Sequence, residues 1–449
     1  MTQSRELFLN TKLSKLFWKA AIPGGVAMLA GSLYMIFDTL FIGKLIGTTA
    51  LAGLGLAMPL VIINFALSEL VGVGSSVPIS IFLGRHEDER ANNYFTSAVL
   101  LIFATGLFSG VLIYLSAPSF MRLMGARGEP LEYAVDYIRV YAIFSPVTSL
   151  MFAMDNFLRI SGKIKTSMIL NIVSSVLTVL AELIFIVVFK LEIVGAALGA
   201  NIAMAATTLF AVGMFVPGKL QLKFVRPHLS ATMFLQIYKN GLAPFLTNVS
   251  GRIFSVLMNV FLLSYSSPRG EAVAIYGVAM TICSVIEQVL YGTIDSLQPS
   301  LGYNYGAKKY SRVKTLERYA MTAGLVISFV GGAFMLIIPA PLSIPFLEDL
   351  TLLDATVTAV RITALAYISK WLYVCINCFF MALEKPIFAM IISISDACII
   401  PLTLLFLLGP FELNGLWMNY PVRTMLSSAL AVFVLWNIKN KLFPKGENQ

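Results

Sequence analysis

Long, uninterrupted apolar stretches constrain this chain more than any other feature of its sequence. Of the 449 residues, 58% are apolar and 12% are charged, and the apolar residues gather in long runs. A helical run of roughly 20 apolar residues matches the hydrocarbon thickness of a bilayer, whereas membrane strands show a weaker, alternating pattern. The composition therefore excludes an ordinary water-soluble enzyme and a disordered scaffold, and it predicts an all-α polytopic membrane protein.

The apolar runs predict twelve membrane helices joined by short polar segments. Pro23 lies inside the first of them, and we expect it to act as a kink or hinge, which membrane helices tolerate. The expected ranges are 16–43, 51–83, 94–117, 131–158, 166–189, 193–216, 237–265, 274–305, 315–340, 357–383, 386–409 and 413–437.

The basic residues predict how these helices are oriented. With twelve spans, 22 Lys and Arg fall on one side of the membrane, Lys445 among them, and 8 fall on the other, Arg269 and Arg423 among them. Because cytoplasmic loops carry the excess of basic residues, both termini are expected in the cytoplasm. The net charge of +9 is then explained by topology and lipid contact, and nucleic acid is not an expected partner.

The sequence repeats itself at a constant offset. Ala52 pairs with Ala274, and the same offset pairs Lys163 with Lys385. A repeat of six spans is even, so two six-helix lobes with the same orientation are predicted, related by a pseudo-two-fold axis along the membrane normal. We expect an N-lobe at 1–216, a cytoplasmic linker at 217–236, and a C-lobe with a cytoplasmic tail at 237–449.

Ionisable residues inside spans are costly, so each is a candidate functional residue. In the N-lobe, Asp38 has no neighbouring opposite charge in the sequence and is expected to bind a proton or a sodium ion. Thr178 and Glu182 share a helical face, and Asn201 could supply a neutral oxygen. These four residues are the predicted site of cation or proton coupling. The alternative for Glu182 is a locally satisfied buried acid.

The other candidates are assigned to a substrate cavity. Arg252 is expected to pair with Glu287 or Asp396, and Lys370 with Asp295 or Asp396. A buried ion-pair network that only stabilises the lobe is an equally open alternative. The complete set comprises Asp155, Arg252, Asn259, Glu287, Tyr291, Asp295, Lys370 and Asp396.

The motifs of other functional classes are missing from the sequence. No GxxxxGK[ST] phosphate loop, HExxH helix or nucleophile elbow occurs, so no enzyme activity and no cofactor are predicted. Cys375 and Cys378 form a CxxC within an apolar stretch, where packing is the simpler explanation than a metal or redox site. Apart from a possible sodium ion at Asp38, no metal is expected.

Several segments resemble the multidrug and toxic compound extrusion (MATE) transporters, in particular their bacterial MepA/DinF-like branch. The segments are FDTLFIG (37–43), LGLAMP (54–59), DNFLRISGK (155–163), VGAALG (194–199) and, most specifically, QPSLGYNYGAKK (298–309). The resemblance implies the MATE fold in a bacterial inner membrane. It also implies an antiporter, driven by protons or sodium, that exports cationic or amphipathic organic compounds by alternating access.

Two departures from the family pattern affect the expected sites. On the fifth span the family's Asn and Asp, four residues apart, are Thr178 and Glu182 here, and its Thr eighteen residues later is Ala200 beside Asn201. A glutamate of one branch, eight residues after the seventh-span proline, is Arg252. A buried Arg252 would favour the binding of a substrate with an acidic or zwitterionic group.

We expect the antiporter to act as a monomer that contacts membrane lipids. Two other functions stay open beside this antiport. A flippase for lipid-linked precursors would hold phosphate with Arg252 and Lys370. A membrane receptor or scaffold without transport would have no need of so many buried acids.

Overall fold

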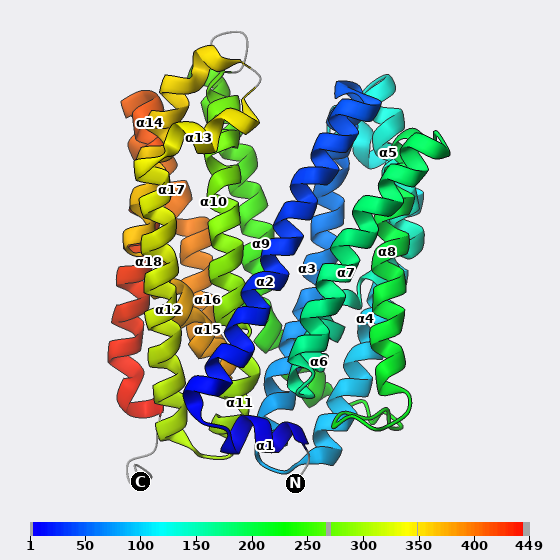
Figure 1. The fold of residues 1–449 in the computed structure, drawn as a ribbon, viewed down its shortest axis with the longest axis vertical. Helices are drawn as coiled ribbons and strands as arrows, with labels where there is room; N and C mark the ends of the chain where they lie inside the picture. The colour runs from blue at the N-terminus through cyan, green and yellow to red at the C-terminus, as the bar shows by residue number, and fades with distance from the viewer. Residues whose placement is uncertain (1–2, 266–270, 348, 443–449) are drawn as a thin grey trace. The chain divides into compact units, whose positions relative to one another are not determined.

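The computed structural model describes residues 3–265, 271–347 and 349–442, and these ranges contain helices and no strand. Eleven helical stretches in them are long and apolar enough to span a membrane. The last, Pro386–Lys439, holds a reverse turn at Gly409–Phe411 and so contains two antiparallel spans (Figure 1). The first consists of α16 (Pro386–Ile394), η6 (Ser395–Ile399) and α17 (Ile400–Leu408), and the second is α18 (Glu412–Leu442). The twelve expected spans are therefore confirmed. Arg269 and Lys445 lie outside the described residues.

The first six spans run from α2 to α8. Two of them contain a π-helical turn, and the fourth is broken into two helices, α5 and α6. The elements are α1 (Gln3–Asn10), α2 (Leu13–Phe41) with η1 (Ile42–Ile46), α3 (Thr48–Gly84), α4 (Asp88–Leu123), α5 (Glu129–Thr148), α6 (Met151–Ile160), α7 (Ile164–Leu183) with η2 (Ile184–Val188), and α8 (Glu192–Phe215).

The other six spans run from α9 to α18. Their fourth span is broken as well, between η5 and α15. The elements are α9 (Ala231–Tyr265), α10 (Glu271–Asp295), α11 (Gln298–Gly306), α12 (Tyr310–Ile337), α13 (Pro339–Ser343), η3 (Ile344–Phe346), η4 (Leu350–Leu352), α14 (Leu353–Ala364), η5 (Leu365–Ile368), α15 (Lys370–Ala382), α16 (Pro386–Ile394), η6 (Ser395–Ile399), α17 (Ile400–Leu408), η7 (Gly409–Phe411) and α18 (Glu412–Leu442).

The chain divides into two compact units. Unit 1 contains the residues up to Thr11 and Val26–Phe245, and unit 2 contains Lys12–Gly25 and the residues from Leu246 onward. The boundaries thus differ from the division expected at 217–236, because they fall inside the first and seventh spans. Pro23 of α2 lies just before one boundary, and Pro244 of α9 lies just before the other.

Glycine contacts explain why each unit includes the beginning of the other repeat's first span. A Cβ added to Gly24 would lie 2.2 Å from the carbonyl oxygen of Gly292, and one added to Gly241 would lie 1.7 Å from that of Leu70. Only glycine allows so close an approach. Leu70 and Gly292 are equivalent positions at the repeat offset, so the same helix crossing occurs in both units.

Two turns repeat at the same offset. His86 and Lys308 both have a left-handed backbone, with φ of 66° and 59°, and so do Gly162 and Glu384, with φ of 78° and 55°. Each ends a helix with the paired backbone hydrogen bonds of a left-handed C-terminal cap, as in Lys163 N to Leu158 O at 2.9 Å. The internal duplication expected from the sequence is therefore visible in the backbone.

Each unit has its own apolar core. Part of the unit 1 core comes from α3, α5 and α8, and part of the unit 2 core from α10, α14 and α18. Large apolar side chains also cover the outside, including Phe108 at 72% exposure and Phe210 at 61%. Such a surface suits lipid and not water.

Replacing His86 by glycine should stabilise the protein. Glycine takes up a positive φ without the steric cost that His86 bears there, so we expect a gain of up to about 1 kcal/mol in the free energy of unfolding. Arg85→Gly is the matched control, because Arg85 has a right-handed backbone with φ of −80° and should lose stability. Unfolding of the purified protein in detergent measures both, and a loss of stability in His86→Gly would contradict the interpretation.

Candidate functional site

Asp38 of α2 and Glu182 of α7 form a buried pair of acids in unit 1. Their exposed fractions are 7% and 1%, and the two carboxyl groups are close enough to interact electrostatically. Within the described residues, no amide, hydroxyl or basic group donates a hydrogen bond to either oxygen of Glu182. Two carboxyl groups so close together repel each other when both are ionised, so a proton or a cation on the pair stabilises this arrangement.

No positive charge neutralises this pair. Neither Asp38 nor Glu182 forms an ion pair with a Lys, Arg or His side chain in the part of the chain that the structure describes. A buried, ionised carboxylate without a partner is very unfavourable, so a proton or a metal cation must balance the charge. The two acids face each other, as the sequence led us to expect.

Two tyrosines that the sequence analysis missed lie beside the acids. Tyr34, one helical turn before Asp38, and Tyr137 of α5 are close enough to interact electrostatically with both carboxyl groups. Tyr34 could have been found from its spacing of four residues on the same helix. Tyr137 could not, because it is brought to the site only by the packing of α5.

Thr178 of α7 and Asn201 of α8 are the two neutral residues of the predicted coupling site. Both are buried, at 1% and 2% exposure, and Thr178 is one turn before Glu182 on α7. The side-chain oxygen of Asn201 accepts no hydrogen bond within the described residues. Close packing of α8 on α7 is fixed by Gly199, where an added Cβ would lie 2.5 Å from the Glu182 amide nitrogen.

A π-helical turn accompanies each of three buried acids. η1 begins four residues after Asp38, η2 begins two residues after Glu182, and η6 contains Asp396. η1 and η2 also pack against each other. Single π turns are frequent at functional sites, because they rotate the helix and redirect side chains.

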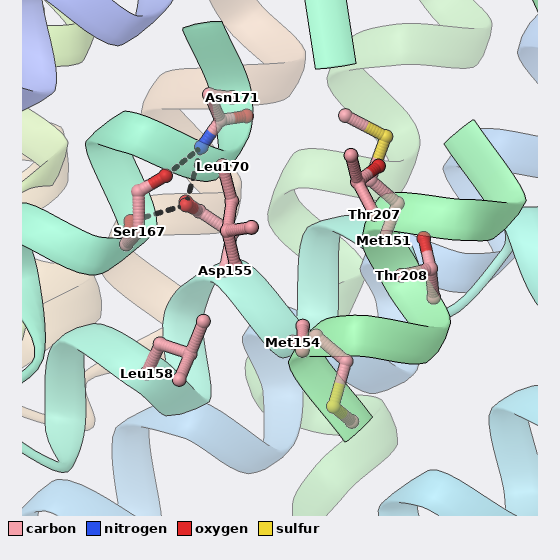
Figure 2. Close-up of a pocket in the computed structure, with 10 residues that line it drawn as sticks. Met151, Met154, Asp155, Leu158, Ser167, Leu170, Asn171, Thr207 and Thr208 are labelled. Atoms are coloured by element: carbon pink, nitrogen blue, oxygen red, sulfur yellow. Dashed lines mark hydrogen bonds between the residues drawn. The ribbon is translucent and has the colours of Figure 1, made fainter. Parts of the chain in front are cut away.

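Asp155 belongs to a separate polar cluster in unit 1. It forms an ion pair with Arg159 at 2.6 Å and accepts hydrogen bonds from Ser167 and from the Asn171 amide, the latter at 2.6 Å (Figure 2). Arg159 is only 4% exposed and also donates to the Ser167 hydroxyl. This carboxylate is thus fully compensated, unlike the Asp38–Glu182 pair.

In unit 2, Lys370 of α15 pairs with Glu287 of α10. Tyr420 of α18 completes the cluster: its hydroxyl donates to Glu287 and receives a hydrogen bond from Lys370 at 2.6 Å. The expected partners of Lys370, Asp295 and Asp396, were therefore wrong. Glu287 is the residue of the α10 face that lies opposite the first turn of α15.

Asp396 pairs with Arg423 of α18. The distance is 2.7 Å, and the Ser427 hydroxyl donates to the same carboxylate at 2.8 Å. Arg423 was counted among the basic residues that report topology, although the expected span 413–437 contains it. The structure places it inside α18, two residues after Pro421, because its guanidinium balances the 4% exposed Asp396.

The rest of the α10 face also meets α15 or the start of α11. The hydroxyls of Tyr291 and Tyr373 are 3.4 Å apart, and Asp295 accepts a hydrogen bond from Gln298 at 3.2 Å. Glu317 of α12, which the sequence analysis did not single out, is buried, and one of its carboxyl oxygens has no hydrogen-bond partner within the described residues.

Arg252 does not belong to the buried network, contrary to expectation. It is exposed on α9 and forms no ion pair among the described residues, so neither Glu287 nor Asp396 is its partner. The inward face of α9 is set by Phe254, Met258 and Leu262, and Arg252 projects from another face. Asn259 is partly exposed.

The described residues contain no group of three or more His, Cys, Asp or Glu arranged to hold a metal ion. Cys375 and Cys378 are buried free thiols close to the carbonyl groups of Ala320 and Ile294.

An all-helical membrane protein built from a six-span repeat has the architecture of many membrane transporters. The MatE family model matches residues 23–184 and 243–407, one match in each repeat. The chain belongs to this family, the MATE family that the motifs indicated, whose members are transporters and not enzymes.

Relatives and solved structures cover nearly the whole chain. The multidrug export protein MepA of Staphylococcus haemolyticus is 24% identical over 437 residues, which are 97% of this chain and 96% of that protein. A multidrug resistance MATE family transporter in an outward-facing conformation has a TM-score of 0.92 at 21% identity, covering 98% of this chain and 99% of that one. A MOP superfamily transporter from Pyrococcus furiosus has a TM-score of 0.91 with the same identity and coverage.

Removing one partner of the Glu287–Lys370 pair should destabilise unit 2. Lys370→Met leaves Glu287 uncompensated, so we expect a loss of about 3–5 kcal/mol in the free energy of unfolding, and Lys370→Met combined with Glu287→Gln should recover much of it. Arg252→Met is the control and should change stability by less than about 0.5 kcal/mol, because Arg252 is exposed. Denaturation of the purified protein in detergent gives these values, and equal effects of the two single substitutions would refute the assignment.

Proposed function

We propose that this protein exports organic compounds from the cytoplasm in exchange for protons, and that Asp38 and Glu182 bind the coupling proton. The single observation that carries this proposal is the buried carboxyl pair without a positive partner. Such a pair can gain or lose one proton within a membrane protein, which is the property that coupling to a proton gradient requires. The names of the relatives, multidrug export protein and multidrug resistance transporter, support organic substrates.

Alternating access would follow from the effect of protonation on α2. With one proton between them, the two carboxyl groups can approach and share a hydrogen bond, whereas loss of that proton leaves two negative charges that must separate or bind a cation. α2 carries Asp38 in unit 1 and, on the other side of Pro23, contributes Lys12–Gly25 to unit 2. A movement of Asp38 would therefore be transmitted along one helix to both units.

Sodium is the alternative coupling ion at the same site. The oxygens of Asp38, Glu182, Thr178 and Asn201 are a donor set that suits a hard cation. The small number of oxygens on the pair favours the proton, because a sodium ion needs several oxygen ligands, whereas a proton needs only one acceptor.

The basic residues support an orientation with both termini in the cytoplasm of a bacterium, within its inner membrane. The proposal treats the monomer as the transporting unit.

The flippase hypothesis is not favoured. It required Arg252 and Lys370 to be available for phosphate, whereas Lys370 is 3% exposed and bound to Glu287 and Tyr420. The receptor hypothesis offers no reason for an uncompensated acid pair.

Asp38→Asn should abolish gradient-driven transport, because the amide cannot exchange a proton. The measurement is uptake of ethidium, an organic cation, into proteoliposomes with an imposed pH gradient or an imposed sodium gradient. Asp136→Asn is the matched control, since Asp136 is exposed on α5, and it should transport like the wild type. Undiminished uptake by Asp38→Asn would overturn the assignment of the coupling site. Uptake driven by the sodium gradient alone would show that the coupling ion is sodium and not the proton.

A further inference from the structure

Polar side chains follow one face of α7 over its whole length. Their spacing of three or four residues places them one above another on the helix. Four of the five are at most 3% exposed, whereas another face of α7 presents Ile169, Val176 and Leu180 to the outside. The line consists of Ser167, Asn171, Ser174, Thr178 and Glu182, and with Thr207 and Thr208 of α8 it is called here the α7–α8 seam.

A small cavity lined by both polar and apolar side chains lies at the lower part of the seam, between α6, α7 and α8. Asp155, Ser167, Asn171, Thr207 and Thr208 all line it (Figure 2). Its water-accessible volume of about 20 Å³ is enough for a water molecule. The cavity is part of unit 1 alone.

One buried hydroxyl in this cavity points to a bound water molecule. Thr208 is 2% exposed, and its hydroxyl has no hydrogen-bond partner within the described residues. An unsatisfied buried hydroxyl is unfavourable by roughly 1–3 kcal/mol, and a water molecule in the cavity removes that cost. A seam that served only for helix packing would leave this group unpaired.

The polar residues of the line follow one another along the helix axis at steps comparable to the span of one bridging water molecule. Asn171 and Ser174 are separated by a rise of about 4.5 Å along the helix, and the steps to Thr178 and Glu182 rise about 6 Å each. Two oxygens bridged by one water are about 5.5 Å apart. Thr207 already donates to Ser174 at 3.3 Å, which links the cavity to the upper part of the seam.

The seam joins two acidic sites with different surroundings. Its upper end is Glu182, whose carboxyl group interacts with that of Asp38. Its lower end is Asp155, which holds Ser167 and Asn171 and is paired with Arg159 at the end of α6. The turn Ser161–Lys163 follows α6 directly, on the side that we assign to the cytoplasm.

We propose that the α7–α8 seam holds a chain of water molecules that carries protons between the Asp38–Glu182 pair and the Asp155–Arg159 end of unit 1. The inference rests on the proposed proton coupling and adds a route for the proton that runs inside one unit. In each step a water or hydroxyl oxygen accepts one proton and gives up another. Only O–H bonds form and break, no oxidant or reductant is needed, and the net result is the movement of one proton.

Hydration of the cavity can be tested without any transport assay. X-ray hydroxyl-radical labelling oxidises side chains next to bound water, and Met154 lines the cavity while being 1% exposed. Met121, 0% exposed in the apolar core of unit 1, is the control. We expect Met154 to be oxidised several-fold faster than Met121, and equal rates would overturn the water chain.

Blocking the seam should slow proton movement and leave substrate binding intact. Ser174→Val places two methyl groups where Thr207 now donates, whereas Ser175→Val is the matched control, because Ser175 bonds only to the backbone of its own helix, at Asn171 O. Each variant is reconstituted in liposomes with an internal pH-sensitive dye, and proton release is measured when ethidium is added.

For Ser174→Val we expect proton release at least several-fold slower than in the wild type, with the same ethidium affinity, and for Ser175→Val we expect the wild-type rate. A proton-coupled wild type whose Ser174→Val variant releases protons at the normal rate would overturn the route and leave the proposed function standing. A wild type that transports ethidium without moving protons would overturn both.

Discussion

The absence of water inside a membrane governs this structure, because every charge within a span must be balanced by another group of the chain or by a bound ion. The two units meet this requirement differently. In unit 2, Glu287 and Asp396 are each balanced by a basic residue and a hydroxyl group. In unit 1, Asp38 and Glu182 have only each other. The compensated pairs can stay permanently charged, whereas we propose that the uncompensated pair takes up a proton from outside the protein.

The duplication of the fold was not accompanied by duplication of this chemistry. At the offset that relates Ala52 to Ala274, Glu287 corresponds to Phe65, and Lys370 corresponds to Thr148. At the offset that relates Pro23 to Pro244, Asp38 corresponds to Asn259. The backbone turns and the close glycine crossings are common to both halves. Asp38, Glu287 and Lys370 each occur in one half only. Two equal scaffolds thus carry unequal sites.

The spans and the repeat could be predicted from the sequence, because hydrophobic length and a constant offset are local or pairwise properties of the chain. The facing of Asp38 and Glu182 also followed, since few buried acids were available in the first six spans. The ion-pair partners of unit 2 did not follow. Which of several charges meet depends on the rotation of each helix: Arg252 lies two residues from the inward-facing Phe254 and projects elsewhere. Arg423 lies inside the expected last span, and no sequence pattern indicated that it would pair with Asp396.

The exchange of helix segments between the units affects the order in which the protein can be assembled. Gly24 is made early, yet its contact partner Gly292 belongs to the eighth span, in the second half of the chain. The beginning of the first span must therefore wait in the membrane, without its final neighbour, until the eighth span has been inserted. Unit 1 needs nothing beyond Phe245 and can close first. The residues Lys12–Gly25 are therefore synthesised before the rest of unit 2, and unit 2 is complete only when the second half of the chain has been made.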